Sequence, residues 1–436
     1  MLLTPRALAL LIAGALPLAA ATIWPAFLLI AAAYFAAALG LLLADLALSP
    51  RPRHFAVARQ CDSRLSLAAD NPIHLHLRND SRHPVAVALR DEFPAGFQTD
   101  HWQLGGTAPA HGALTLRYHL KPLRRGDYRF GDLNLRYRGV LGLVVRQQRY
   151  PAAAPVKVYP NLLEIRRYEQ LARRGQLHEI GLRQARLLGR GTEFERLREY
   201  QPDDDYRRIN WKATARRGRP VSVAYETERS QNVVLMLDAG RLMAAPIGPL
   251  AKLDYAVNAA LMLAYVAARS GDNVGLLAFA DRIAAHLPPR RGKRQFLAML
   301  EALYRLPPQL TEADYDLAFR YFAAHSHKRS LVVLFTDLID PETSRLLVSH
   351  IAALSPHHLT LCVTIADPGI TTLAAAAPRD SRTVYQRAVA EDLLAERRRA
   401  LESLRRRGVI ALDLPAEQLT ATVINRYLEL KARTRL

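Results

Sequence analysis

The first 48 residues carry the strongest pattern in the chain, because residues 7–44 are almost wholly apolar. Only Thr22 and the pair Trp24–Pro25 interrupt this run. One bilayer crossing needs roughly 20 apolar residues. The run therefore predicts a two-span transmembrane hairpin in residues 1–48, with helices at about 7–23 and 26–44 and Trp24 at an interface. A cleaved signal peptide is the alternative, but the second apolar run would still anchor the chain.

The charges that flank the two spans predict their orientation. Arg6 precedes the first span, and basic residues follow the second at Arg51, Arg53 and Arg59. Basic residues near the ends of a span favour the cytoplasmic side of a membrane. We therefore expect both ends of the hairpin, and the soluble domains that follow, to lie in the cytoplasm.

Residues 55–160 alternate between apolar and polar positions with a period of two. The alternation is clear in four segments: Ile73–Arg78, Val85–Arg90, Leu114–Leu120 and Leu133–Tyr137. Turn residues such as Asn79 and Asp80 separate these segments. Short strands at this spacing predict a small β-sandwich-like domain.

Strands and helices alternate in residues 231–436. Val233–Leu237 and Leu331–Phe335 are continuous apolar runs, which are typical of strands covered on both faces. We expect further strands and helices at Leu253–Arg269 (helix), Asn273–Phe279 (strand), Lys293–Arg305 (helix), Pro341–Leu354 (helix), His358–Ile365 (strand), Glu391–Arg407 (helix), Val409–Leu412 (strand) and Ala416–Leu430 (helix). This alternation predicts a doubly wound, mostly parallel sheet. The predicted fold class is thus a membrane-anchored α/β protein.

Residues 161–230 are predicted to be a connector with a charged helix, followed by an unusual charged segment. Residues 191–216, here named the signature segment, combine many charges with the anchors Phe194, Tyr200 and Trp211. A disordered linker would lack such anchors. An ordinary helix would not contain the turn at Pro202–Asp205.

The signature segment closely resembles that of a bacterial membrane-protein family of unknown function. Members of this family pair with MoxR-type AAA+ ATPases and carry a von Willebrand factor A-like domain. The resemblance covers most of residues 55–436. It implies a Rossmann-like von Willebrand A-like domain at 231–436, a location in the bacterial inner membrane, and a MoxR-type ATPase as partner. It also implies a non-enzymatic scaffold or adaptor in a chaperone-like role for protein clients that the sequence does not identify.

The signature segment has two interpretations, which both stay open. Its dense charges form a surface suited to the docking of a partner protein. The candidate docking residues are Glu193, Glu199, Asp203, Asp204, Asp205, Arg207, Arg208, Trp211 and Arg216. Alternatively, the charges pair with one another while Trp211 and Tyr200 hold the segment over a domain core.

Two acidic residues end apolar strands and suggest a cation site. Asp238 follows Val233–Leu237, and Asp337 follows the second apolar run. Carboxylates at the ends of parallel strands suit a hard cation such as Mg²⁺. The resemblance implies Asp-x-Ser-x-Ser after the first strand, but Gly240 and Leu242 replace the two serines, and Thr311 is the candidate for a further ligand. We therefore expect a degenerate, metal-free site, with a metal-dependent enzyme as the alternative function.

The composition limits the classes of partner that this chain is expected to bind. Its net charge of +20 is spread along the sequence among acidic residues, with no basic run that is interleaved with aromatics. This favours a basic surface near anionic membrane lipid over a nucleic-acid binder, which is the second alternative function. No phosphate-binding loop motif occurs, so we expect no ATP hydrolysis by the chain itself. The arginines of Glu396–Arg407 are predicted to lie on the solvated face of a helix.

Overall fold

The computed structural model describes residues 2–174, 194–200, 209–225, 230–338, 341–354, 356–377 and 379–432. The chain divides into two compact units, Met1–Asn161 and Leu162–Leu436. We call them unit 1 and unit 2.

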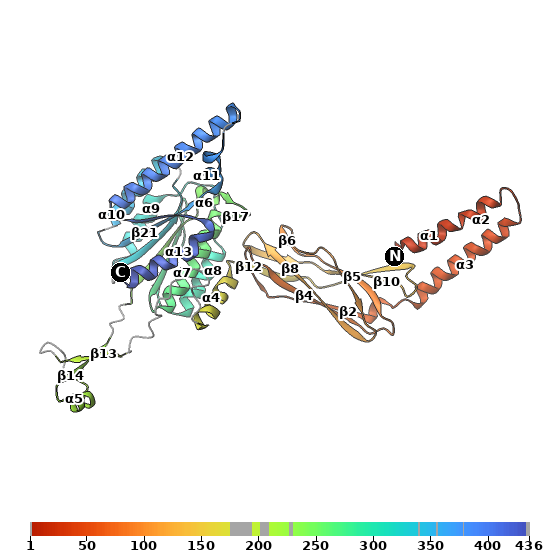
Figure 1. Ribbon diagram of the computed structural model, residues 1–436, viewed down its shortest axis with the longest axis horizontal. Coiled ribbons are helices and arrows are strands. Elements are labelled where there is room, and N and C mark those ends of the chain that lie inside the picture. Colours follow the sequence, from red (N-terminus) through yellow and green to blue (C-terminus); the bar gives the residue numbers. More distant parts are fainter. Residues whose placement is uncertain are drawn as a thin grey trace. The chain divides into compact units, whose positions relative to one another are not determined.

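The apolar N-terminal run forms an antiparallel helical hairpin in unit 1. Helices α1 (Pro5–Ala13) and α2 (Ala15–Ala20) make one arm, and α3 (Phe27–Leu48) makes the other (Figure 1, red). Among the described residues, the stretch Phe27–His54 is long and apolar enough to cross a membrane, whereas Pro5–Ala20 is shorter. At 1.5 Å per residue, α3 is about 33 Å long, which matches a hydrocarbon core of about 30 Å. Such a helix near the N-terminus fits a membrane anchor or a signal sequence.

The two arms of the hairpin meet at a break in the first arm. A side chain at Gly14 would collide with α3, because its Cβ would lie 2.7 Å from the Phe35 ring. The Tyr34 hydroxyl donates a hydrogen bond of 2.7 Å to the carbonyl of Leu10, one turn before the break. In apolar surroundings a backbone carbonyl needs such a partner. Tyr34 and Gly14 therefore fix how the arms pack.

The rest of unit 1 is built from β-strands, as the alternating pattern predicts. The strands are β1 (Leu2–Leu3), β2 (Phe55–Gln60), β3 (Arg64–Ser66), β4 (Asn71–Asn79), β5 (Val85–Asp91), β6 (Phe97–Thr99), β7 (Leu104–Ala108), β8 (Gly112–Pro122), β9 (Gly126–Phe130), β10 (Leu133–Arg138), β11 (Val144–Tyr150) and β12 (Ala154–Tyr159). They form two antiparallel sheets in the orders β1-β11-β10-β5-β7 and β2-β4-β8-β6, and a smaller sheet β3-β12-β9 in which β3 and β12 are parallel. A short 3₁₀ helix (Pro52–His54) links α3 to β2.

The two larger sheets of unit 1 bury their apolar faces against each other. In β4, Ile73, Leu75 and Leu77 are fully buried, while the residues between them are more exposed. The ring of Phe55 on β2 lies 4.7 Å from that of Tyr137 on β10, so the sheets are in contact. This is the sandwich arrangement expected of strands with one apolar face.

One residue counted above as a flanking charge belongs to this core. The Arg59 side chain is only 3% exposed and pairs with Asp91 at 2.5 Å. It also donates to the carbonyls of Ala152 and Gly131, at 2.8 and 2.9 Å. Its charge is therefore neutralised inside unit 1, and Arg51 and Arg53 are the exposed basic residues after α3.

The last turn of α3 is joined to the β-strands through Asp45. Its buried carboxylate accepts hydrogen bonds from the backbone N–H groups of Leu141, Leu143 and Val144, at 2.7, 2.8 and 2.9 Å. A Cβ at Gly139 would collide with this carboxylate, so the turn needs glycine there. The first arm is joined to the same region, because β1 pairs with β11.

Unit 2 contains a six-stranded sheet in the order β19-β18-β15-β20-β21-β22. The strands are β15 (Asn232–Asp238), β18 (Asn273–Phe279), β19 (Ile283–Arg290), β20 (Ser330–Thr336), β21 (Leu359–Ala366) and β22 (Ile410–Pro415). All neighbours are parallel except the edge strand β19, which is antiparallel to β18. The predicted mostly parallel sheet is therefore present.

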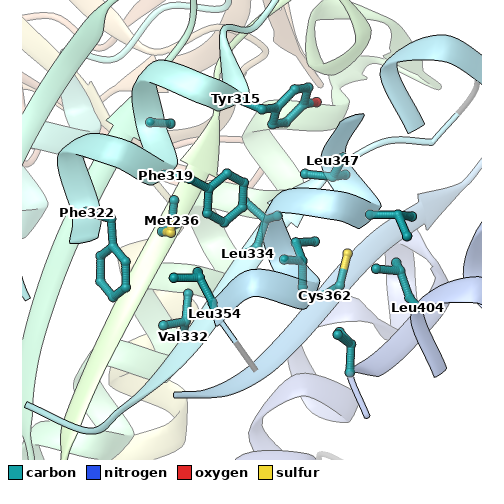
Figure 2. Packing of buried hydrophobic residues seen from close by; sticks show 14 of the residues in the cluster. Met236, Tyr315, Phe319, Phe322, Val332, Leu334, Leu347, Leu354, Cys362 and Leu404 are labelled. Carbon is teal, nitrogen blue, oxygen red and sulfur yellow. The ribbon is translucent and has the colours of Figure 1, made fainter. Parts of the chain in front are cut away.

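Helices cover both faces of this sheet (Figure 1). One layer contains α7 (Lys252–Arg269), α8 (Lys293–Tyr304) and α13 (Leu419–Ala432), and the other contains α9 (Tyr315–His325), α10 (Pro341–Leu354) and α12 (Ser381–Arg406). Figure 2 shows the core under the second layer, where Met236 of β15 and Leu334 of β20 meet Phe319 of α9. The shorter elements of unit 2 are α4 (Leu162–Arg174), β13 (Phe194–Glu199), α5 (Trp211–Arg217), β14 (Val221–Tyr225), α6 (Arg241–Ala244), β16 (Pro246–Ile247), β17 (Leu250–Ala251), α11 (Pro368–Ala375) and a 3₁₀ turn at Ala416–Gln418.

Candidate functional site

The strand order places a topological switch point between β15 and β20. From β15 the chain continues to β18 on one side, and from β20 it continues to β21 on the other. Ligands of open α/β sheets bind outside the carboxyl ends of the strands at such a point. Asp238 ends β15 and Asp337 directly follows β20, so the sheet brings the two predicted acidic residues to this edge.

Asp238 is held by neutral hydrogen-bond donors. The residue is 1% exposed. Its carboxylate accepts hydrogen bonds from the Tyr315 hydroxyl (2.7 Å), the Thr336 hydroxyl (2.8 Å) and the Gly240 N–H (2.8 Å). Burial raises the pKa of Asp238, although these hydrogen bonds act to lower it. Burial and the Asp238 charge also raise the pKa of Tyr315 well above its ordinary value, so its hydroxyl remains a donor.

Asp337 is held by two cations instead. Lys252, in the first turn of α7, donates to its carboxylate at 2.5 Å. Arg397 of α12 donates to the other carboxylate oxygen, and also binds Asp413 of β22 at 2.7 Å. We refer to Lys252, Asp337, Arg397 and Asp413 as the buried ion network. Asp337 and Lys252 are each 1% exposed, so water does not solvate either charge.

Both cations of this network correct or extend the expectations from sequence. Arg397 was expected on the solvated face of its helix, but it is buried because the carboxylates of Asp337 and Asp413 face it. Burial disfavours the charged guanidinium, yet these two carboxylates raise the pKa of Arg397 above its usual value. Sequence reasoning missed Lys252, whose one signal is a lysine at the start of a helix that is mostly apolar.

Thr311 does not join the two carboxylates. Its carbonyl accepts a hydrogen bond of 2.8 Å from the N–H of Arg241, and the residue is exposed. The hydroxyl that reaches Asp238 from this part of the chain is that of Tyr315. Asp314, three residues after Thr311, caps α9 by accepting the N–H of Leu317.

The residues at this edge do not fit a magnesium ion. Mg²⁺ binds carboxylate oxygens together with several waters. The Asp337 oxygens are engaged by Lys252 and Arg397, and Gly240 offers no hydroxyl. The hollow beside Asp238 measures about 10 Å³, which is room for about one water. Lys252 thus supplies the positive charge that a cation would have provided.

The raised pKa of Asp238 predicts a pH-dependent contribution to the stability of unit 2. The folded state holds this proton more tightly than the unfolded chain, whose Asp pKa is about 3.9. Protonation of Asp238 therefore stabilises the fold at low pH, and this contribution is lost as pH rises through the folded-state pKa. Asn cannot titrate. The wild type should consequently lose stability relative to an Asp238→Asn variant as pH rises above about 4, the unfolded-state pKa.

Labelling of Cys362 provides the measurement. Cys362 is fully buried, and burial raises its pKa to about 12, so it reacts when unit 2 opens. In a Cys61→Ser background, a dipyridyl disulfide reagent that reacts at acid pH reports the opening. The labelling rate of Asp238→Asn divided by that of the wild type should fall as pH rises. A constant or rising ratio would contradict the expected sign.

The described part of the signature segment forms a small hairpin with a helix, together with the strand β14 that follows it. Strands β13 and β14 pair antiparallel, and α5 lies between them in sequence. Asn210 caps α5 by accepting the N–H of Ala213 at 3.0 Å, and the Thr214 hydroxyl accepts the N–H of Val221. These bonds tie α5 to β14 locally.

The structure describes three of the nine candidate docking residues. Trp211 is 69% exposed, and Arg216 is exposed on the same short helix. Glu199 is exposed and pairs with Arg219 at 3.1 Å. The other six lie outside the described residues: Glu193, Asp203, Asp204, Asp205, Arg207 and Arg208. Within the described residues, the indole of Trp211 is therefore a surface group.

Comparisons with known proteins place part of the chain among bacterial relatives. Residues 196–379 match the family described as "Protein of unknown function DUF58". The chain is 26% identical to the uncharacterized protein Rv1480 of Mycobacterium tuberculosis over 198 residues. This aligned region covers 44% of this chain and 60% of the relative. It is 27% identical over 195 residues to the uncharacterized protein YeaD of Bacillus subtilis, which covers 43% of this chain and 48% of the relative. The chain thus spans 60% or less of these curated relatives.

A solved structure gives a weaker likeness. Proximal thread matrix protein 1 from the mussel byssus is 11% identical, with a TM-score of 0.26, over 46% of this chain and 47% of its own. A similarity of this size says nothing further about the chain. The family match and the two bacterial relatives support a bacterial domain-of-unknown-function family for this protein.

Proposed function

We propose that this protein is a membrane-anchored, non-enzymatic adaptor that works with a MoxR-type AAA+ ATPase in the assembly or maturation of other proteins. The resemblance of the signature segment supports the partner. The order of the strands, with an antiparallel edge strand β19, supports a von Willebrand A-like fold for unit 2.

The buried ion network is the observation that carries the non-enzymatic part of this proposal. At the switch point, where an α/β enzyme would bind its ligand, Asp337 is neutralised by Lys252 and Arg397. A carboxylate engaged by two buried cations is a poor general base and a poor metal ligand. The Asp337 carboxylate is therefore engaged in ion pairs that stabilise the fold, which supports a role without catalysis at this edge.

The exposed face of α5 supports the adaptor part. Aromatic and arginine side chains dominate the binding energy of protein interfaces. Trp211 exposes most of its ring beside the exposed basic residues Lys212, Arg216 and Arg217. An exposed indole with adjacent cations suits an acidic surface on a partner.

We also propose that both arms of the N-terminal hairpin cross the inner membrane and that the soluble parts face the cytoplasm. The pairing of β1 with β11 supports an even number of crossings, because it holds the start of the first arm beside the strands that follow the second. The exposed residues Arg51 and Arg53 support the cytoplasmic orientation.

Replacement of Trp211 by Ala tests the docking surface. We expect a loss of about 2 kcal/mol in binding of the ATPase, or roughly a 30-fold weaker complex, as for a central interface tryptophan. The measurement is recovery of the ATPase by the intact protein after crosslinking in cells. Since the ATPase uses cytoplasmic ATP, its recovery also tests the proposed orientation.

Trp102→Ala is the matched control, because Trp102 is 66% exposed but lies in unit 1. It should leave recovery unchanged. Equal recovery with both variants would move the docking surface away from α5. If the wild type itself recovers no AAA+ ATPase, the adaptor proposal fails.

A further inference from the structure

A basic groove runs between α10 and α12 in unit 2. Its volume is about 260 Å³, and its lining is Leu338, Arg345, Val348, Ser349, Glu396, Arg397, Arg399, Ala400, Ser403 and Arg407. The groove lies just past β20, on the same edge of the sheet as the buried ion network. It is far larger than the hollow beside Asp238.

Three of the arginines in this groove have no anionic partner among the described residues. Arg397 is engaged by Asp337 and Asp413. By contrast, Arg345, Arg399 and Arg407 are exposed, and none has an ion pair with another described residue. Against these charges, the described lining residues contain one carboxylate, that of Glu396. Within the part of the chain that the structure describes, the groove therefore has more guanidinium groups than carboxylates.

The floor of the groove is apolar. Val348 and Leu338 are buried beneath it, and Ala400 is partly buried. A guanidinium binds a carboxylate through two parallel hydrogen bonds, which fix the orientation of the carboxylate. Cations around an apolar floor therefore suit a ligand that presents carboxylates on either side of one apolar side chain.

We propose that this groove binds a short acidic segment of a partner protein, with carboxylates on Arg345, Arg399 and Arg407 and an apolar side chain on the floor. A flat bilayer or a duplex nucleic acid would use the charges but not the concave floor, and Glu396 would repel dense phosphate. The proposal does not depend on the ATPase partnership, since it concerns a surface apart from α5.

The test uses the full chain in detergent micelles and a fluorescent peptide of sequence Glu-Glu-Leu-Glu-Glu. We expect Arg345→Glu with Arg399→Glu to weaken peptide binding at least about 10-fold, as expected when paired charges are replaced by repelling ones. Arg382→Glu with Arg398→Glu is the matched control. These arginines are exposed on α12 outside the groove, and the change in charge is the same. Unchanged Cys362 labelling in both variants shows that unit 2 remains folded.

Two further probes test the chemistry of the ligand. Peptides with Gln for Glu, or Gly for Leu, should each bind at least about 10-fold more weakly if both charge and floor are used. The proposal is overturned if the control variant loses as much binding as the groove variant, or if the Gly peptide binds equally well. It is also overturned if inorganic phosphate competes as well as the peptide does, or if vesicles of anionic phosphatidylglycerol bind through these arginines while the peptide does not.

Discussion

A Lys252→Met variant is expected to lose about 3–5 kcal/mol of the free energy of unfolding of unit 2. The substitution keeps a long apolar stem but removes the ammonium that binds Asp337 at 2.5 Å. Asp337 then stays buried with Arg397, which already shares its charge with Asp413. A buried carboxylate that loses one of two cations retains most of its desolvation penalty, so the folded state becomes less stable.

Labelling of Cys362 measures this loss. A loss of about 3 kcal/mol in the free energy of opening raises the population of open states, and with it the labelling rate, about 150-fold. Lys293→Met is the control, because Lys293 is exposed on α8 and its loss should change stability by less than about 0.5 kcal/mol. Adding Asp337→Asn to Lys252→Met should restore part of the stability. Equal labelling rates for Lys252→Met and the wild type would show that the lysine is not needed to balance Asp337.

An Arg59→Met variant is expected to have an effect of similar size in unit 1, about 3–5 kcal/mol. Arg59 joins Asp91 to two backbone carbonyls and lies over the Phe130 ring, 4.3 Å from its centroid. Without it, Asp91 keeps the Tyr118 hydroxyl at 2.7 Å as a partner, which does not neutralise the charge. The carbonyls of Gly131 and Ala152 also lose a donor.

Hydrogen exchange of the amides of β4 and β8, measured by mass spectrometry in micelles, reports this loss. The matched control is Arg78→Met, since Arg78 forms an exposed pair with Asp80 that is worth less than about 1 kcal/mol. Combining Arg59→Met with Asp91→Leu should recover stability, because no charge then remains buried. Exchange as slow in Arg59→Met as in Arg78→Met would refute the structural role of the buried pair.

The sequence predicts the framework of both units well, because their cores follow simple periods. The strands at Val233–Leu237 and Asn273–Phe279, and the helix at Leu253–Arg269, agree with β15, β18 and α7 within two residues. The edge strand β19 was missed, because Pro288 and Pro289 are typical of loops. The start of α12 at Ser381 was missed too, since its first ten residues are mostly exposed. Its signal was the capping box of Asp380 and Thr383.

The candidate site was predicted less completely, because its decisive partners come from distant elements. The positions of Asp238 and Asp337 follow from where two apolar runs end. Lys252 and Arg397 reach Asp337 from α7 and α12, 85 and 60 residues away in sequence, and no local pattern marks those pairs. Arg397 lies in the polar stretch Glu396–Arg399, which predicts an exposed side chain. It is buried because the fold places Asp413 of β22 next to it.

The bonds between Asp45 and residues 141–144 have a mechanical consequence. The β-rich part of unit 1 is joined to α3 by more than the connecting chain, since three of its backbone N–H groups bind Asp45 in the last turn of that helix. For a helix seated in a bilayer, tilt changes with the thickness of the surrounding lipid. Because of these hydrogen bonds, the strands would rotate together with the helix when it tilts. The strand β8 has 11 residues and is about 36 Å long, so a rotation of about 10° would move its far end by about 6 Å.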